Sequence, residues 1–201
     1  KNQSNSDSTT LSIRQPLVDK LRAADLIVQE EWSHHADGDP DARVYVKVSA
    51  SPNRLKQVAD VMGKQGKLKL RLRSSDPTER NEGPWCAFRQ HMQSEFEESS
   101  EKSNSLFSSL QQIRILEFIL EDRDKMAMGP QLVHPKTLQA GYTPLEWLFK
   151  EKQIKGFFRM HHEPTRKKLQ NQWVWKWKDK QPIEQIREYF GEKIALYFVF
   201  L

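Results

Sequence analysis

The side chains best suited to metal chemistry in this chain are its six histidines, and their spacing defines no metal site. They form two adjacent pairs, His34-His35 and His161-His162, while His91 and His134 stand alone. Adjacent residues of a strand point to opposite faces, and no spacing among these histidines repeats a zinc-binding pattern. We therefore expect these histidines at the surface or in turns.

The acidic run Asp122-Arg123-Asp124 begins like the calcium-binding loop of an EF-hand. Met126 and Ala127 then occupy the third ligand position and the position that requires glycine, so the loop fails as a calcium site. Cys86, the one cysteine, has no protease-like context, and the glycine-rich phosphate loops and G-x-S-x-G are absent from the sequence. Nothing in the sequence argues for an enzyme, and we expect no metal and no cofactor in this chain.

Two short segments resemble RNA-binding motifs. Residues 61–66 (VMGKQG) resemble the GXXG loop of a KH domain, but a strand pattern follows where that domain needs a helix. Lys155-Gly156-Phe157 opens like the RNP1 strand of an RRM, yet Phe158 and His162 stand where a small residue and an aromatic belong. We favour a glycine-terminated helix for the first segment and a core strand for the second.

A basic strand follows the first of these segments. In residues 67–73, leucines alternate with Lys67, Lys69, Arg71 and Arg73, which predicts a half-buried strand with one basic face. Such a face suits phosphate groups, but it also protects an edge strand from pairing. Together with the net charge of +5, it leaves nucleic acid and anionic lipid open as partners.

Tryptophans and lysines interleave in residues 173–180 (WVWKWKDK). Trp173 and Trp177 are one helical turn apart and are expected in the core, whereas Trp175 is expected to face outward at the level of lipid headgroups. The basic residues that we assign with Trp175 to a lipid interface are Lys176, Lys178, Lys180, Arg187 and Lys193. They precede an apolar run, and the positive-inside bias then places the domain in the cytosol.

That apolar run, residues 194–201 (IALYFVFL), contains no charge and no helix breaker. As a helix it would reach only about 12 Å, against about 30 Å for the hydrocarbon core of a bilayer. We interpret it as the first third of a transmembrane helix and the chain as a fragment. About ten or more further apolar residues after Leu201 would favour this interpretation, and a polar continuation would favour a soluble protein.

The residues around this run resemble the junction between the cytosolic domain and the first transmembrane helix of the anoctamins. The junction motif consists of Pro182, Tyr189, Phe190, Gly191, Tyr197 and Phe198. Upstream, Phe107-Ser108 and Ile115-Leu116 resemble a helix of the family, although Gln111-Gln112 replaces a frequent Glu-Arg. The resemblance covers residues 107–201 and is weak before them.

The resemblance implies a parent that is a calcium-activated chloride channel or a phospholipid scramblase, and some family members occupy the endoplasmic reticulum. This chain would be its cytosolic regulatory or structural domain, and calcium would bind to later transmembrane helices outside the chain. The implied partners are the rest of the transmembrane domain, membrane lipids and a second copy of the parent, without nucleic acid. The alternatives are a soluble ferredoxin-like RNA-binding module and a membrane-tethering module.

The predicted fold is α+β, with a small ferredoxin-like antiparallel sheet and helices packed on one face. The strands are expected at residues 25–32, 43–49, 67–73 and 154–160. The helices are expected at residues 16–24, 52–62, 108–128 (the longest), 145–152 and 164–178. The domain boundaries are a disordered N-terminus over 1–15, a cytosolic domain over 16–180, a juxtamembrane amphipathic helix over 181–193 and a truncated transmembrane helix over 194–201.

Overall fold

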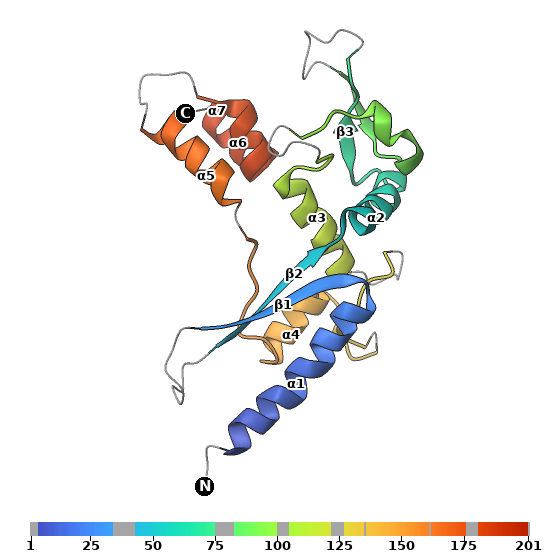
Figure 1. Cartoon of the computed structure of the whole chain (residues 1–201), viewed down its shortest axis with the longest axis vertical. Helices are drawn as coiled ribbons and strands as arrows, with labels where there is room; N and C mark the ends of the chain where they lie inside the picture. Colours follow the sequence, from blue (N-terminus) through green and yellow to red (C-terminus); the bar gives the residue numbers. More distant parts are fainter. Residues whose placement is uncertain are drawn as a thin grey trace. The chain divides into compact units, whose positions relative to one another are not determined.

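The computed structural model describes residues 4–33, 43–74, 83–99, 105–121, 127–134, 136–160, 162–175 and 181–200 (Figure 1). Its α+β class agrees with the sequence-based prediction. The elements in chain order are α1 (Ser4–Ala23), β1 (Leu26–Trp32), β2 (Val44–Ala50), α2 (Pro52–Lys64), β3 (Lys69–Arg71), β4 (Trp85–Ala87), the 3-10 helix η1 (Gln90–Glu95), α3 (Ser109–Leu120), α4 (Pro144–Lys150), α5 (Glu163–Leu169), the π-helical turn η2 (Gln170–Val174), α6 (Ile183–Phe190) and α7 (Glu192–Val199). The chain forms two compact units, one of residues 1–61 and 116–157 and the other of residues 62–115 and 158–201.

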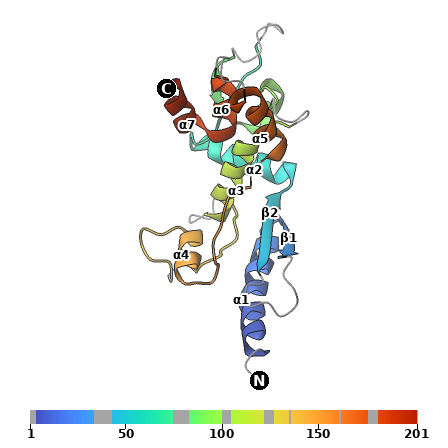
Figure 2. The same cartoon turned by 90° about the vertical axis from the view of Figure 1, so that its left-hand side faces the viewer.

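In the first unit, β1 and β2 form an antiparallel pair, and α1 lies along it (Figure 1 and Figure 2). Val28 pairs with Val48, and Glu30 pairs with Val46. The predicted face of alternating valines on β2 therefore lies beside the face of β1 that carries Leu26, Val28 and Glu30. Glu30 on this face accepts ion pairs from Arg14 and Arg22 of α1, at 3.2 and 3.5 Å. Helix α1 therefore covers the face that carries Leu26, Val28 and Glu30.

Helix α1 begins at Ser4, twelve residues before the expected start at Pro16. No glycine or proline interrupts residues 4–15, and Pro16 has a φ that a helix accepts, although it donates no hydrogen bond. With 20 residues, α1 is also the longest helix in the described part of the chain, whereas the sequence favoured the helix after Ser108.

Apolar side chains of α1, β1, α2, α3 and α4 form the interior of the first unit. The buried apolar residues are Val18, Leu21, Leu26, Leu55, Val58, Ala59, Ile119, Ala127, Leu132 and Leu148. Arg54 is buried with them, and its Nη2 atom donates to the carbonyl oxygens of Ala127 and Met128 at 2.7 and 3.0 Å. Its charge is thus stabilised by two main-chain carbonyl dipoles.

Helix α2 ends in a glycine cap of the Schellman type. The Lys67 N–H donates to the Met62 carbonyl at 2.8 Å, the Gly66 N–H donates to the Gly63 carbonyl at 3.0 Å, and Gly66 has φ +69°. Strand β3 follows at Lys69. The KH-like segment is therefore a helix terminus followed by a strand, as the sequence favoured.

In the second unit, β3 and β4 form a short antiparallel pair, extended by a bridge between Leu72 and Phe96. Leu68 and Leu70 are buried while Lys67 and Lys69 are exposed, so the predicted alternation is confirmed from Lys67 to Leu70. Strand β3 itself covers only Lys69–Arg71 of the strand expected at residues 67–73. The buried side of the pair meets three phenylalanines. The rings of Phe96 and Phe107 each lie 5.3 Å from the ring of Phe88.

Helix α3 begins with the predicted capping box. The Ser108 N–H donates to Gln111 Oε1 at 2.9 Å, and the Gln111 N–H donates to Ser108 Oγ at 3.3 Å. The helix ends at Leu120, earlier than the expected stop at Gly129-Pro130. Its buried centre is Ile115 and Ile119.

Residues 154–160 form no strand, which corrects the prediction of a core strand there. Phe157, Phe158 and Met160 are all more than half exposed. A strand needs a neighbour for its main-chain donors and acceptors, and the apolar side chains of this segment cover no core. The described strands form two separate pairs, β1 with β2 and β3 with β4, rather than one sheet.

Candidate functional site

The C-terminal helices α5, α6 and α7 lie side by side and share a small apolar core (Figure 1 and Figure 2). Leu169, Ile186, Tyr189 and Ala195 are its buried members. Trp173, Ile183 and Phe198 pack against them. Of the six residues of the predicted membrane junction, Tyr189 and Phe198 belong to this core.

Helix α6 supplies the centre of this core. Pro182 takes the N-cap position, where its missing N–H costs no helical hydrogen bond, and Ile186 is fully buried one turn later. Tyr189 is also buried, and its ring meets the ring of Phe190 edge-on at 4.7 Å. The sequence predicted one amphipathic helix over residues 181–193, and within this range α6 covers Ile183–Phe190 while α7 begins at Glu192.

Gly191 separates α6 from α7. Its backbone angles, φ 93° and ψ 169°, lie in a region that is almost restricted to glycine. A Cβ atom there would lie 3.3 Å from Arg114 Nη2 and 3.5 Å from Leu110 Cδ2 of α3. The joint between the two helices thus depends on glycine for both its angles and its space.

Helix α7 uses only part of its apolar surface for packing. Ala195 is buried, and the Phe198 ring meets the Trp173 ring edge-on at 4.7 Å. The remaining apolar side chains face solvent: Ile194, Leu196, Tyr197, Val199 and Phe200 are from 42% to 85% exposed. A helix that is apolar on all sides is normally covered on all sides, by protein or by lipid.

The predicted lipid-interface residues are placed only in part. Trp175 is 70% exposed, as the sequence predicted, and Lys193 is exposed on α7. Lys176, Lys178 and Lys180 lie outside the described residues, as does Trp177. The helix expected over residues 164–178 begins at Glu163 and changes to a π-helical turn at Gln170.

Arg187 is bound within the second unit rather than extended into solvent. Its guanidinium pairs with Glu184 at 2.5 Å and lies 5.5 Å from the ring centroid of Trp85 on β4. Arg71 on β3 lies 5.1 Å from the same centroid. The sequence analysis did not identify Trp85 as a contact of these arginines, because it did not predict β4. In the observed register, Trp85 is paired directly with Arg71.

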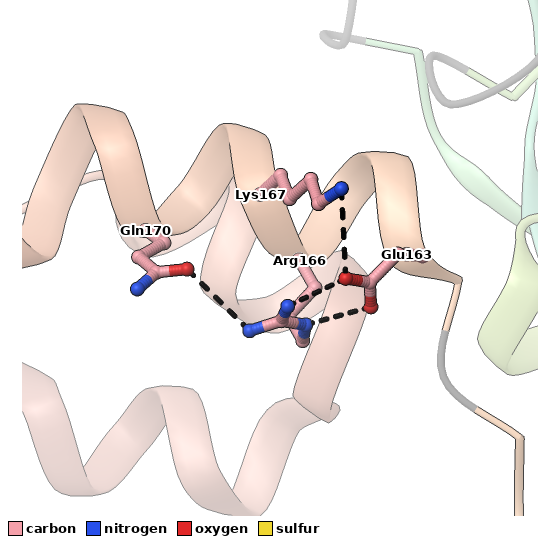
Figure 3. Close-up of polar contacts among 4 residues, drawn as sticks. All are labelled: Glu163, Arg166, Lys167 and Gln170. Atoms are coloured by element: carbon pink, nitrogen blue, oxygen red, sulfur yellow. Dashed lines mark hydrogen bonds and ion pairs between the residues drawn. The ribbon is translucent and has the colours of Figure 1, made fainter.

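The outer side of α5 carries a chain of polar contacts (Figure 3). Arg166 binds Glu163 through Nε at 2.8 Å and through Nη2 at 2.5 Å, and its Nη1 reaches Gln170 at 3.4 Å. The hydrogen bond and the charge of Glu163 raise the pKa of Arg166. Because the pKa of an arginine is already far above neutrality, Arg166 keeps its charge throughout the neutral range.

In the part of the chain that the structure describes, the other candidates from the sequence form no common site. Within the described ranges, no three side chains of His, Cys, Asp or Glu are grouped as metal ligands would be. His34, His35, His161 and the run Asp122-Arg123-Asp124 lie outside those ranges. His162 is the N-cap residue of α5, and its Nδ1 lies 2.7 Å from Thr165 Oγ1.

The structure contains no helix, in the part of the chain that it describes, with both the length and the apolar character for spanning a bilayer. Neither a scan against protein-family models nor a search of curated proteins returns a match to this chain.

Proposed function

We propose that this chain is the cytosolic regulatory or structural domain of an anoctamin-like membrane protein, and that α7 leads into its first transmembrane helix. The parent would transport chloride, scramble phospholipids, or do both, under the control of calcium that binds outside this chain. The domain itself would act mechanically. Its partners would be the remaining transmembrane domain, the adjacent lipid and a second copy of the parent.

One observation carries the proposal: α7 packs one side on α5 and α6 and leaves an apolar outer side exposed. Fully burying one side chain of the size of Leu or Phe contributes about 1.5–3 kcal/mol, so several of them give a strong preference for a nonaqueous contact. Trp175 and Lys193 supply the aromatic and basic groups that are typical of a lipid interface.

A soluble RNA-binding module is the alternative, and its two sequence signals lack their required context. The GXXG-like segment is a helix cap with a strand after it, and the RNP1-like segment is not in a strand.

We also propose a ferredoxin-like arrangement for the complete domain. The order strand, strand, helix, strand from β1 to β3 supports it.

The experiment is flotation of the 201-residue chain with lipid vesicles. We expect binding to vesicles of phosphatidylcholine with phosphatidylserine, and a loss of about tenfold or more in affinity for Leu196→Asp or Phe200→Asp, because a charge in the apolar phase is costly. Tyr45→Asp on β2 is the control, since Tyr45 is also an exposed apolar residue, 45% open to solvent, but lies in the other unit. Equal flotation of all variants, or none by the wild type, would contradict the proposal.

A further inference from the structure

The outer side of the β3–β4 pair gathers positive charge around one exposed tryptophan. Arg71 and Trp85 are directly paired across the strands, so both side chains lie on the side opposite to buried Leu70. Lys69 shares that side by the alternation of the strand, and Trp85 is 49% exposed. Arg187 reaches the same ring from α6.

Two guanidinium groups therefore lie against the same ring. Each is within 5.5 Å of the Trp85 centroid, which puts the two charges no more than about 11 Å apart, near the screening length of about 10 Å in 0.1 M salt. Glu184 neutralises Arg187, and in the described ranges no carboxylate is ion-paired with Arg71. The cluster keeps an excess of positive charge, so an anion bound to it would stabilise it.

The geometry points to a binding site for a phosphomonoester lipid headgroup formed by Arg71, Trp85 and Arg187; this inference rests on the proposed function, which puts α6 and α7 at a membrane. The guanidinium fork matches phosphate oxygens in pairs, and tryptophan favours the headgroup level. Once Glu184 has neutralised Arg187, the excess positive charge of the cluster comes from Arg71 and Lys69. These two charges can balance a phosphomonoester, which carries about −1.5 to −2, whereas a diester carries a single charge. The bound headgroup would bridge the β3–β4 pair and α6.

The test compares two vesicle types of matched surface charge, one with phosphatidic acid and one with phosphatidylserine. The full chain is expected to bind the phosphatidic acid vesicles about fivefold more tightly. The double variant Arg71→Gln/Arg187→Gln should lose this preference but still bind phosphatidylserine vesicles through α7. The double variant Arg71→Lys/Arg187→Lys keeps the charge but removes the guanidinium groups, so it should lose most of the preference for phosphatidic acid. Lys47→Gln on β2 is the control and should keep that preference.

Competition separates the sources of the phosphate. Glycerol 3-phosphate should abolish the preference for phosphatidic acid vesicles only at high concentration, since this soluble compound lacks the membrane contact that α7 makes. Tight binding of this soluble compound without vesicles would overturn the assignment to lipid. The assignment would also be overturned if single-stranded RNA bound more tightly than vesicles and the variant Arg71→Gln/Arg187→Gln lost this RNA binding. If α7-dependent flotation persists without any headgroup preference, the site is refuted and the proposed function stands. If the wild type does not bind vesicles at all, both are refuted.

Discussion

At the scale of single residues, two glycines fix where helices end and how closely they approach. Gly191 adopts φ 93° and ψ 169° between α6 and α7, and Gly63 packs directly on the main chain of Phe88. The sequence identified Gly63 as a helix terminator and Gly191 as part of a family motif. It did not reveal the packing of Gly63, because the contact with Phe88 is long-range and β4 was not predicted.

Replacing Gly191 by alanine should destabilise the second unit. The backbone angles are strained for any residue with a Cβ, at a cost of about 1–3 kcal/mol, and the new methyl group crowds Arg114. Chemical denaturation of the full chain measures the loss. Gly156→Ala is the control, because Gly156 has open space around it and should change the stability little. Equal stability of the two variants would show that the joint does not need glycine.

Gly63→Ala tests whether this glycine serves packing. An added Cβ would lie 2.0 Å from the Phe88 carbonyl oxygen, so the helix or β4 must shift, and overpacking of this kind typically costs about 1–3 kcal/mol. A fall in the thermal midpoint relative to the Gly156→Ala control is the expected result. A variant that keeps its stability but loses affinity for RNA would instead support the GXXG interpretation.

At the scale of elements, local signals predicted the start of α3 and the glycine-capped end of α2, but not the strand pairing. The capping box of Ser108 and Gln111 lies within four residues, so the sequence alone reveals it. The segment 154–160 has strand-forming residues, but a strand depends on a partner that local sequence does not specify. The inner and outer sides of α7 were hidden for a related reason, since every residue from 194 to 201 is apolar.

The Ser108 cap should contribute measurably to stability. Ser108→Ala removes the acceptor for the Gln111 N–H, and loss of such a cap costs about 0.5–2 kcal/mol. Urea denaturation of Ser108→Ala and of Ser94→Ala, an exposed serine outside any cap, gives the comparison. A Ser108→Ala variant as stable as Ser94→Ala would contradict the role of the capping box.

The two sides of the C-terminal helices should respond differently to truncation. Ile186→Ala opens a cavity in the core of α5, α6 and α7 and should cost about 2–5 kcal/mol. Leu196→Ala removes a side chain that is 56% exposed and should change the stability by less than about 0.5 kcal/mol. Comparable losses in thermal unfolding would mean that the outer side of α7 is packed as firmly as the inner side.

At the scale of the whole molecule, the α+β class followed from the alternation of strand and helix patterns, whereas the division into two units did not. Each unit combines distant parts of the chain, residues 1–61 with 116–157 and residues 62–115 with 158–201. Such long-range pairing depends on packing between segments, which periodicity does not encode. The cluster of Arg71, Trp85 and Arg187 depends on the same long-range pairing.

The central claim is that the outer side of α7 contacts lipid, and a fluorescent probe at that position measures it. In a Cys86→Ser background, which removes the one native cysteine, Leu196→Cys carries an environment-sensitive dye, and Tyr45→Cys on β2 is the control. On addition of phosphatidylcholine and phosphatidylserine vesicles, the dye at position 196 should shift to the blue and be quenched by spin labels within the acyl chains, while the dye at position 45 should not change. An unchanged signal at position 196 in the presence of vesicles would contradict the account.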